Sequence, residues 1–599
     1  MRQERTFWLL AASIALLAFL PYLQSAWFDF VMYDDNQYVT SNLVVRKGLT
    51  FSGIGWAFTS LGFAANWHPL TWLSLMTDVS LFGVSSGAMH LVNAAFHAAN
   101  AVLLFLLLHR LTGRLDAAFL AAALWAVHPL RVESVAWVTE RKDVLSTFFG
   151  LAAAVCYLKA VRPAAPAGSA RSAWILLATG LFALGFMAKP AVVTLPALAA
   201  LLEYAVSGRV RWRHIELLVW MAVAGMLVTI YAQGQGGAVA GAADVPPPLR
   251  VWNSIASVGT YVRQTFWPAN LAVLYPLRMA VPKGSFAFGL LVCAAAGVAF
   301  WATCFSARAR AAGPVAGGST NLRSRLPYAV AIGWFLVALA PMLGILQVGA
   351  QAHADRYTYW PSIGLAIGTA WAIAQFRSAS PPSAIPSRVV FPALAAAAAV
   401  LGAAATRQVA VWRDTETILG VTAARTSPNP IADQNLGIYL CLKGRPHEGL
   451  AQLRRSEASL TRAPALPRTG FETRLAWGLA LAGSLDEAGA LALRLREADS
   501  SSGLPPLVLG MIARQRHALA AAEHRIRAVL REHPGLAVAW WEYGKVLADQ
   551  RRWPEAKAAW QRTHELDPWL GPDEASMIVD ARAAASPAVD WRSLIESDD

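Results

Sequence analysis

Two adjacent carboxylates, Asp34 and Asp35, follow the first long uncharged run of the chain, in the segment FDFVMYDDNQYVTSN. Adjacent carboxylates can bind a divalent cation such as Mg²⁺ or Mn²⁺ through their oxygens. One of them can instead serve as a general base when its neighbour raises its pKa. A solvated loop would carry the same residues, so the pair alone leaves catalysis, metal binding and a plain loop open.

A second group of charges lies in HPLRVESVAWVTERKD, at the end of a predicted span over residues 116–137. Charged side chains at a membrane boundary are costly unless they are paired or used. A cluster with both positive and negative side chains can bind an anionic substrate and transfer a proton. The alternative is that these charges only form salt bridges at the end of a helix. The group comprises His128, Arg131, Glu133, Glu140, Arg141, Lys142 and Asp143. Within it, Glu133 is predicted to be catalytic, and the residues predicted to bind substrate are His128, Arg131, Arg141 and Asp143.

Two further cations lie at predicted ends of spans. Lys189 precedes Pro190 at the apex between two spans, and Arg356 lies in HADRYTYWPSIG, before another span. Arginine offers a planar fork that suits phosphate, and lysine offers a point charge. Together with Arg131, these cations predict a pocket for a lipid-linked phosphate.

Polar side chains also lie within the second predicted span. His90, Asn93 and His97 are spaced i, i+3 and i+7, which places them on one helix face. Polar residues inside a span usually face a cavity or a partner helix. We predict that His90 lines the substrate site, and an imidazole bonded to a neighbouring backbone carbonyl is the alternative.

Several common chemistries are excluded by missing motifs. The sequence has no glycine-rich phosphate loop, no HExxH, no GxSxG and no dinucleotide fingerprint. A nucleotide-driven pump and a soluble-type hydrolase are therefore disfavoured. The four cysteines show neither a disulfide framework nor metal-ligand spacing.

The elements that must position these residues are membrane spans. Of 599 residues, 56% are hydrophobic and 15% charged, against about a quarter charged in a soluble domain. Residues 1–406 hold long uncharged runs, and about 20 apolar residues cross a bilayer. The first span is read as uncleaved. Eleven spans are predicted, at 7–27, 90–109, 116–137, 143–159, 172–189, 190–206, 215–233, 284–305, 326–347, 358–376 and 388–406.

Basic residues in the short loops set the sidedness of these spans. The net charge of +14 is concentrated largely in such loops, which indicates cytoplasmic loops rather than a nucleic-acid partner. The N-terminus is then inside and the C-terminal domain outside. Residues 250–270 are apolar but contain Arg263, and we read them as a helix at the outer interface. The predicted outer segments are 28–89, 138–142, 233–283 and 348–357.

The rest of the chain has the composition of a soluble domain and a repeated pattern. Four windows in 430–568 share Gly, Leu and Ala positions, and the clearest copies follow a 34-residue period typical of tetratricopeptide repeats. Residues 407–429 are predicted as a linker and 569–599 as a tail. Such a solenoid presents a concave groove that can hold an acceptor polypeptide. A spacer or an oligomerisation module is the alternative.

The order of these motifs resembles a known family. The acidic pair, HPLRVESVAWVTERKDVLS and DRYTYWPSIG, followed by further spans and repeats, are similar to the transmembrane and tetratricopeptide-repeat O-mannosyltransferases and their bacterial relatives. The resemblance covers nearly the whole chain. It implies an all-α protein: a polytopic helical bundle of about eleven spans of the GT-C glycosyltransferase type, followed by a tetratricopeptide-repeat α-solenoid.

The resemblance also implies a chemistry. The donor would be a polyprenyl-phosphate-linked sugar held in the membrane lipid, and the site would face the outer side. If a hydroxyl acceptor attacks the anomeric carbon in a single displacement, inversion at that carbon follows. Asp34 and Asp35 match the family's first-loop acidic pair, the base or metal site. The acceptor would be a polypeptide, presented by the repeats.

Other residues match the family's second-loop cluster and its phosphate contact. Glu133, Arg141 and Asp143 match the cluster, and Arg356 matches the arginine before the aromatic-Pro-Ser-Ile-Gly stretch. Thr358 departs from the pattern, because the family often has an apolar residue there. The array of about four repeats is also small, which affects acceptor choice more than chemistry.

Other functions stay open at this stage. A glycosyltransferase acting on lipid or polysaccharide would carry the same cluster, whereas a membrane-anchored scaffold would need few polar groups within its spans. A transporter would be expected to show paired broken helices, which we do not find. A bacterial inner membrane with periplasmic repeats fits the short Ala- and Arg-rich chain, and an endoplasmic-reticulum lumen would satisfy the same topology.

Overall fold

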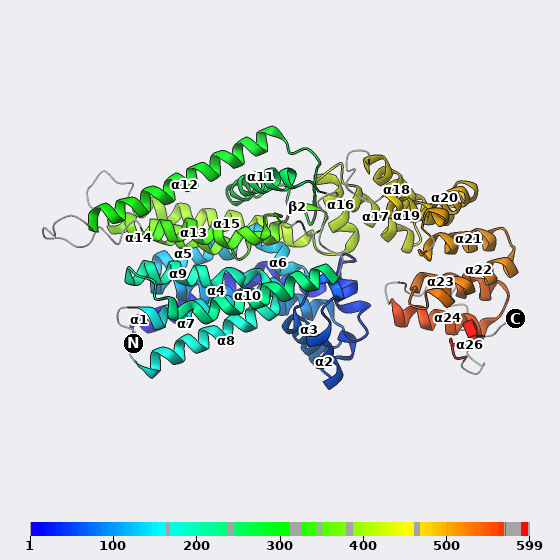
Figure 1. Cartoon of the computed structure of the whole chain (residues 1–599), viewed down its shortest axis with the longest axis horizontal. Coiled ribbons are helices and arrows are strands. Elements are labelled where there is room, and N and C mark those ends of the chain that lie inside the picture. Colours follow the sequence, from blue (N-terminus) through cyan, green and yellow to red (C-terminus); the bar gives the residue numbers. More distant parts are fainter. Residues whose placement is uncertain are drawn as a thin grey trace. The chain divides into compact units, whose positions relative to one another are not determined.

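In the computed structural model the chain folds into two compact units (Figure 1). The first comprises Met1–Asp29 and Gly48–Asp414, and the second comprises Phe30–Lys47 and Thr415–Asp599. The chain thus crosses between the units three times, and the segment 30–47 groups with the repeats although it lies within the predicted domain 1–406. The structure describes residues 2–162, 168–235, 245–311, 326–345, 347, 349–378, 387–460, 468–499, 501–567, 570 and 589–596.

Long apolar helices dominate the first unit, because a helix satisfies every backbone polar group within one segment. Among the described residues, eight helical stretches are long and apolar enough to cross a membrane. These stretches lie on α1 (Arg2–Phe19), α4 (Ser86–Thr112), α7 (Arg141–Val161), α8 (Ser169–Ala188), α9 (Leu195–Ser207), α10 (Trp212–Gln235), α12 (Lys283–Ala311) and α15 (Ser387–Ala410).

The other three predicted spans are shorter or broken. Helix α5 (Leu115–Ala126) is followed by the stretch Pro129–Ala136 at a bend of 61°. The ring of Pro129 and its missing N–H explain the break. Helices α13 (Leu326–Leu339) and α14 (Ser362–Ser378) are apolar but short. The prediction of a helical bundle with about eleven spans is therefore confirmed.

Smaller elements connect the spans. Helices α2 (Phe51–Thr59) and α3 (Pro69–Phe82) lie in the first loop, and α6 (Val132–Ala136) lies between α5 and α7. Helix α11 (Pro247–Phe266) contacts α12 and is not among the apolar stretches found in the described chain. Its location at the membrane interface stays a prediction. Strands β1 (Tyr275–Pro276) and β2 (Gln351–His353) pair antiparallel.

The second unit contains a row of helical hairpins. Helix α16 (Thr415–Arg425) lies within the predicted linker and contacts the first hairpin. The four predicted repeat windows coincide with four helix pairs. Pro568, which closes the last window, and most of the predicted tail lie outside the described residues. The pairs are α17 (Pro430–Leu442) with α18 (Pro446–Leu460), α19 (Arg468–Leu481) with α20 (Leu485–Ala498), α21 (Leu504–Gln515) with α22 (Leu519–Glu532), and α23 (Ala537–Asp549) with α24 (Trp553–Leu566); α26 (Ser593–Glu596) follows.

Small residues at repeat positions allow the paired helices to approach closely. A Cβ atom added to Gly544 in α23 would lie 2.4 Å from Nε1 of Trp560 in α24. The Trp560 indole is held there, because its Nε1 donates to the carbonyl of Trp541 at 3.0 Å. The glycine is therefore required by the helix–helix distance.

We predict that Gly544→Ala destabilises the repeat unit by about 1–3 kcal/mol, the usual cost of overpacking a tight core contact. Gly535→Ala is the matched control, because a Cβ there meets no atom within 4 Å. Urea unfolding of the full-length protein in detergent measures both variants. Equal unfolding free energies for the two variants would contradict the packing account.

Candidate active site

The charged segment predicted from HPLRVESVAWVTERKD folds as a series of short turns. After the break at Pro129, a 3-10 turn (Pro129–Arg131), helix α6 and a second 3-10 turn (Val138–Glu140) lead into α7. Each turn changes the direction of the chain, and the charges of this segment pair with Lys189 and Arg356 from other parts of the sequence. The result is a buried cluster of mixed sign at one end of the bundle.

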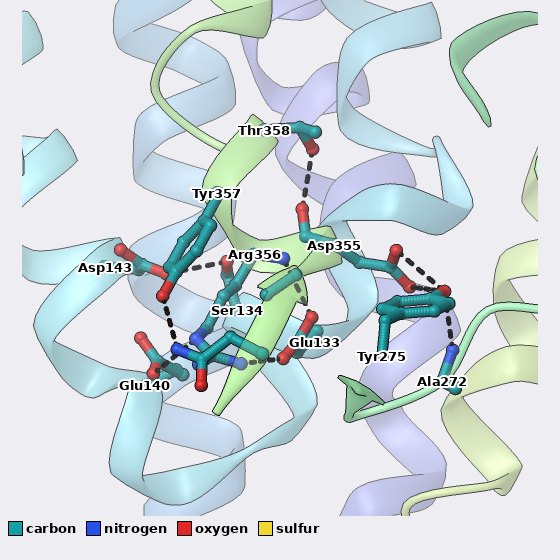
Figure 2. A network of polar contacts seen from close by, with 12 residues as sticks. Glu133, Ser134, Glu140, Asp143, Ala272, Tyr275, Asp355, Arg356, Tyr357 and Thr358 are labelled. Atoms are coloured by element: carbon teal, nitrogen blue, oxygen red, sulfur yellow. Dashed lines mark hydrogen bonds and ion pairs between the residues drawn. The ribbon is translucent and has the colours of Figure 1, made fainter. Parts of the chain in front are cut away.

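Arg356 lies at the centre of this cluster (Figure 2). Its backbone N–H donates to Oε2 of Glu133 at 2.8 Å, and its Nη1 pairs with Oε1 of the same carboxylate. Its Nε lies 3.3 Å from Oε1 of Glu140. Both glutamates are at most 3% exposed. A guanidinium fixed by two buried carboxylates is held in one orientation, which is the arrangement needed to present it to a planar anion.

Lys189 is the second cation of the cluster. Its Nζ lies 2.9 Å from Oε2 of Glu140 and 2.6 Å from Oδ1 of Asp143. Lys142 adds a contact of 3.4 Å to Oε1 of Glu140. The hydroxyl of Ser134 donates to Oδ2 of Asp143 at 2.9 Å. Glu140 is thus shared among three cations, Arg356 included, and joins segments that are far apart in the sequence.

A fourth carboxyl, Asp355, lies beside the cluster. Burial raises the pKa of Asp355 well above its ordinary value, and the charge of Glu133 raises it further. The hydroxyl of Tyr275 donates to Oδ1 at 3.0 Å, and Gln264 Nε2 donates to the same oxygen at 3.2 Å. The ion pairs of Arg356 run to Glu133 and Glu140, whereas Asp355 is held by Tyr275 and Gln264.

Arg141 forms a separate buried ion pair. Its Nη2 lies 2.6 Å from Oδ2 of Asp78 in α3, with the Arg141 side chain fully buried. Its Nε donates to Oδ1 of Asn93, and its Nη1 donates to Ser74 at 2.8 Å. These contacts join α3, α4 and α7, which makes Arg141 a residue that positions the start of α7.

Arg131 contacts the chain around the predicted phosphate-binding stretch. Its Nη1 donates to the carbonyl of Thr358 at 2.9 Å and to the hydroxyl of Ser362 at 2.6 Å. Its Nη2 donates to the Thr358 hydroxyl at 2.9 Å. The departure from the family pattern at Thr358 therefore has a structural use, because the hydroxyl accepts a bond from Arg131. Arg131 therefore stabilises the 3-10 turn Asp355–Thr358, which carries Arg356.

The two predicted substrate-binding histidines contact backbone carbonyls. Nε2 of His90 lies 3.3 Å from the carbonyl of Asp29, and Nε2 of His128 lies 2.9 Å from that of Thr265. Nδ1 of His128 also accepts the N–H of Leu130. These contacts correspond to the packing alternative considered for His90 from the sequence.

Asp34 and Asp35 belong to the second unit. Asp34 has a φ of 117°, a strained backbone conformation for a residue with a side chain. Asp35 is buried, and its Oδ2 accepts the N–H of Val31 at 2.9 Å. Strain of this kind persists only where the surroundings impose it, and it recurs at functional sites.

The metal prediction has limited support from side chains. In the described part of the chain, no group of three or more His, Cys, Asp or Glu residues is arranged to hold a metal ion. The carboxylates of Asp34 and Asp35 are nevertheless hard oxygen donors of the kind that Mg²⁺ prefers. A cation at this pair would need further oxygens from water or from the donor phosphate.

Comparison with known proteins adds to this geometry. Residues 69–232 match the family model described as dolichyl-phosphate-mannose-protein mannosyltransferase. The chain is 34% identical over 149 residues to the protein O-mannosyl-transferase Tmtc2 of Drosophila melanogaster. This alignment covers 24% of this chain and 15% of that protein. It is 28% identical over 226 residues to TMTC4 of Homo sapiens, covering 34% and 30%. The chain resembles protein O-mannosyltransferases.

The resemblance inferred from the motifs is thus confirmed. The aligned segments span less than a third of either relative. Among solved structures, the apo oligosaccharyltransferase of Archaeoglobus fulgidus overlaps 73% of this chain and 57% of its own at 13% identity and a TM-score of 0.36, a partial overlap that by itself assigns no fold. The apolar helices and the family match together show a multi-pass membrane protein.

The family match divides the candidate residues. The matched segment contains His90, His128, Arg131, Glu133, Arg141, Asp143 and Lys189, whereas Asp34, Asp35 and Arg356 lie outside it. Asp78 and Glu140 are among the residues of the network that carried no assigned role from the sequence. Asp78 had a signal, as a single acid within an apolar helix. No signal in the sequence indicated the bridging position of Glu140, because its partner Lys189 is 49 residues away.

We predict that Asp78→Ala destabilises the protein by about 3–5 kcal/mol, because it leaves the buried guanidinium of Arg141 without its counterion. The matched control is Asp116→Ala, which removes a partner of Arg114 in a pair whose side chains are 37% and 30% exposed. Such a pair contributes about 0–1 kcal/mol. Unfolding of both variants in detergent tests this, and similar losses would contradict the assignment.

Proposed function

We propose that this protein moves a sugar, mannose by resemblance, from a polyprenyl-phosphate donor to a Ser or Thr hydroxyl of a polypeptide, on the outer face of the membrane. The observation that carries the proposal is the origin of the charge cluster. The segment that matches the mannosyltransferase family contributes Glu133, Glu140, Asp143 and Lys189 to it. We place the protein in a bacterial inner membrane with periplasmic repeats, and with no nucleic-acid partner.

In this proposal, Arg356 and Lys189 stabilise the leaving phosphate. Both cations are already held by buried carboxylates, so little reorganisation is needed when charge develops on the phosphate oxygen. The guanidinium provides two parallel donors and the ammonium a point charge. Arg131 and Arg141 are positioning residues, because they hold the backbone and helices around the site. His90 and His128 are also positioning residues, because their rings contact backbone carbonyls.

The reaction is a single displacement with inversion. The acceptor oxygen forms a bond to the anomeric carbon while the bond from that carbon to the phosphate oxygen breaks. The hydroxyl proton passes to the carboxylate of Asp34 or Asp35, and polyprenyl phosphate leaves. The base assignment rests on the resemblance and on the strained backbone at Asp34. A divalent cation held by this pair would help to neutralise the phosphate.

The alternatives differ in acceptor or in chemistry. A transferase acting on lipid or polysaccharide would use the same cations, so only the acceptor distinguishes it. A membrane-anchored scaffold is disfavoured, because buried charges in a membrane domain are costly and serve no purpose in an anchor. The cluster buries three carboxylates and pairs them with Arg356 and Lys189.

We predict that purified protein in detergent transfers radiolabel from one member of a panel of polyprenyl-phosphate sugars to polypeptide. Arg356→Lys should lower kcat by about 10²–10³-fold, the usual cost of losing one preorganised donor in the transition state. Asp34→Asn and Asp35→Asn should abolish transfer in folded protein, and EDTA should reduce it if the pair holds a cation.

Arg278→Lys is the matched control, since Arg278 is an exposed arginine of the predicted outer segment 233–283. It should transfer at the wild-type rate. No transfer from any donor to a mixed acceptor extract would refute the proposal, and label appearing only in lipid or polysaccharide would establish the alternative acceptor. Wild-type activity in both aspartate variants would refute the base assignment.

A further inference from the structure

The acidic segment 30–47 is built into the repeat unit rather than being a free loop between spans. It groups with residues 415–599, although its neighbours on both sides in the sequence, Asp29 and Gly48, belong to the first unit. Val31, Val39 and Val45 are fully buried. A loop whose only role was to connect two spans would have no reason to bury these side chains.

Hydrogen bonds tie this segment to both ends of the repeat row. The N–H of Met32 donates to Oγ1 of Thr415, the first residue of α16, at 2.9 Å. The hydroxyl of Ser41 donates to Oδ1 of Asp567, just after α24, at 3.1 Å. Arg46 Nη1 lies 3.4 Å from the carbonyl of Glu565. The segment therefore links the first helix of the row to the last.

Asp34 and Asp35 lie between these attachment points. The N–H of Tyr38 donates to the carbonyl of Asp34 at 2.9 Å, and the Asp35 carboxylate accepts the N–H of Val31. These local bonds shape the turn, but a φ of 117° at Asp34 is strained for a residue with a side chain and persists only with support from its surroundings. The contacts to Thr415 and Asp567 are in a position to supply that support.

We propose that the repeat unit holds the acidic segment in its working conformation, with Thr415 and Asp567 as positioning residues for Asp34 and Asp35. This inference rests on the proposed function and deepens it. The repeats then have a role in the chemical step besides any role in holding the acceptor. An acceptor polypeptide that shifts the first helix relative to the last would also move the acidic turn.

The test uses the full-length protein and two readouts. Thr415→Val removes the oxygen that accepts the Met32 N–H, and Asp567→Ala removes the acceptor of the Ser41 hydroxyl. Hydrogen exchange over residues 30–47 should become faster in both variants. The kcat of transfer should fall by about tenfold to a hundredfold, as expected when a reacting group is slightly misplaced, with the KM for donor unchanged.

Conservative and remote variants control for general damage. Thr415→Ser and Asp567→Asn keep the acceptor oxygens and should restore both readouts. Thr473→Val and Asp486→Ala remove the same side-chain groups elsewhere in the repeats, where the Thr473 hydroxyl donates to the carbonyl of Thr469 and the Asp486 carboxylate accepts from Arg516. These two should behave as wild type.

The outcomes separate this inference from the proposed function. Unchanged exchange in Thr415→Val and Asp567→Ala, or faster exchange with wild-type kcat, would overturn the positioning role. A rise in donor KM equal to the loss in kcat would also overturn it. If the wild-type protein transfers no sugar, the proposed function fails, and the exchange data alone decide whether the repeats hold the acidic segment.

Discussion

The bridging of Glu140 between Arg356 and Lys189 is the interaction on which the rest of the site depends. A charge buried in a membrane domain is tolerated only with a partner in close contact. Glu140 supplies that partner for two cations, Lys189 and Arg356, that are far apart in the first unit's sequence. The helix breaks at Pro129, and the short turns that follow place the Glu140 carboxylate next to both cations.

A cluster of this kind is preorganised rather than flexible. Glu133 and Glu140 fix the guanidinium, while Asp143 and Glu140 fix the ammonium. Under the proposed function, a phosphate bound by these cations would compete with the carboxylates that already hold them. Arg131 and Arg141 hold the neighbouring segments, through Thr358 and Ser362 in one case and through Asp78 and Ser74 in the other.

Much of this fold is readable from the sequence, because apolar run length and 34-residue periodicity are local properties. The spans and the four helix pairs fall in that class, whereas the ion pairs of Glu133 with Arg356 and of Asp143 with Lys189 join residues far apart in the sequence. What the sequence did not show depends on distant contacts. The pairing of Arg141 with Asp78, and the attachment of residues 30–47 to the repeats, join segments that no local pattern connects.

The central claim is that Arg356 and Lys189 form the phosphate site, and ligand binding without turnover tests it most directly. Thermal unfolding of the purified protein would be followed with increasing polyprenyl phosphate, which has no sugar to transfer. The account predicts a concentration-dependent rise in Tm for the wild-type protein, by mass action, and little or no rise for Arg356→Lys or Lys189→Met. An equal rise in all three proteins would contradict it.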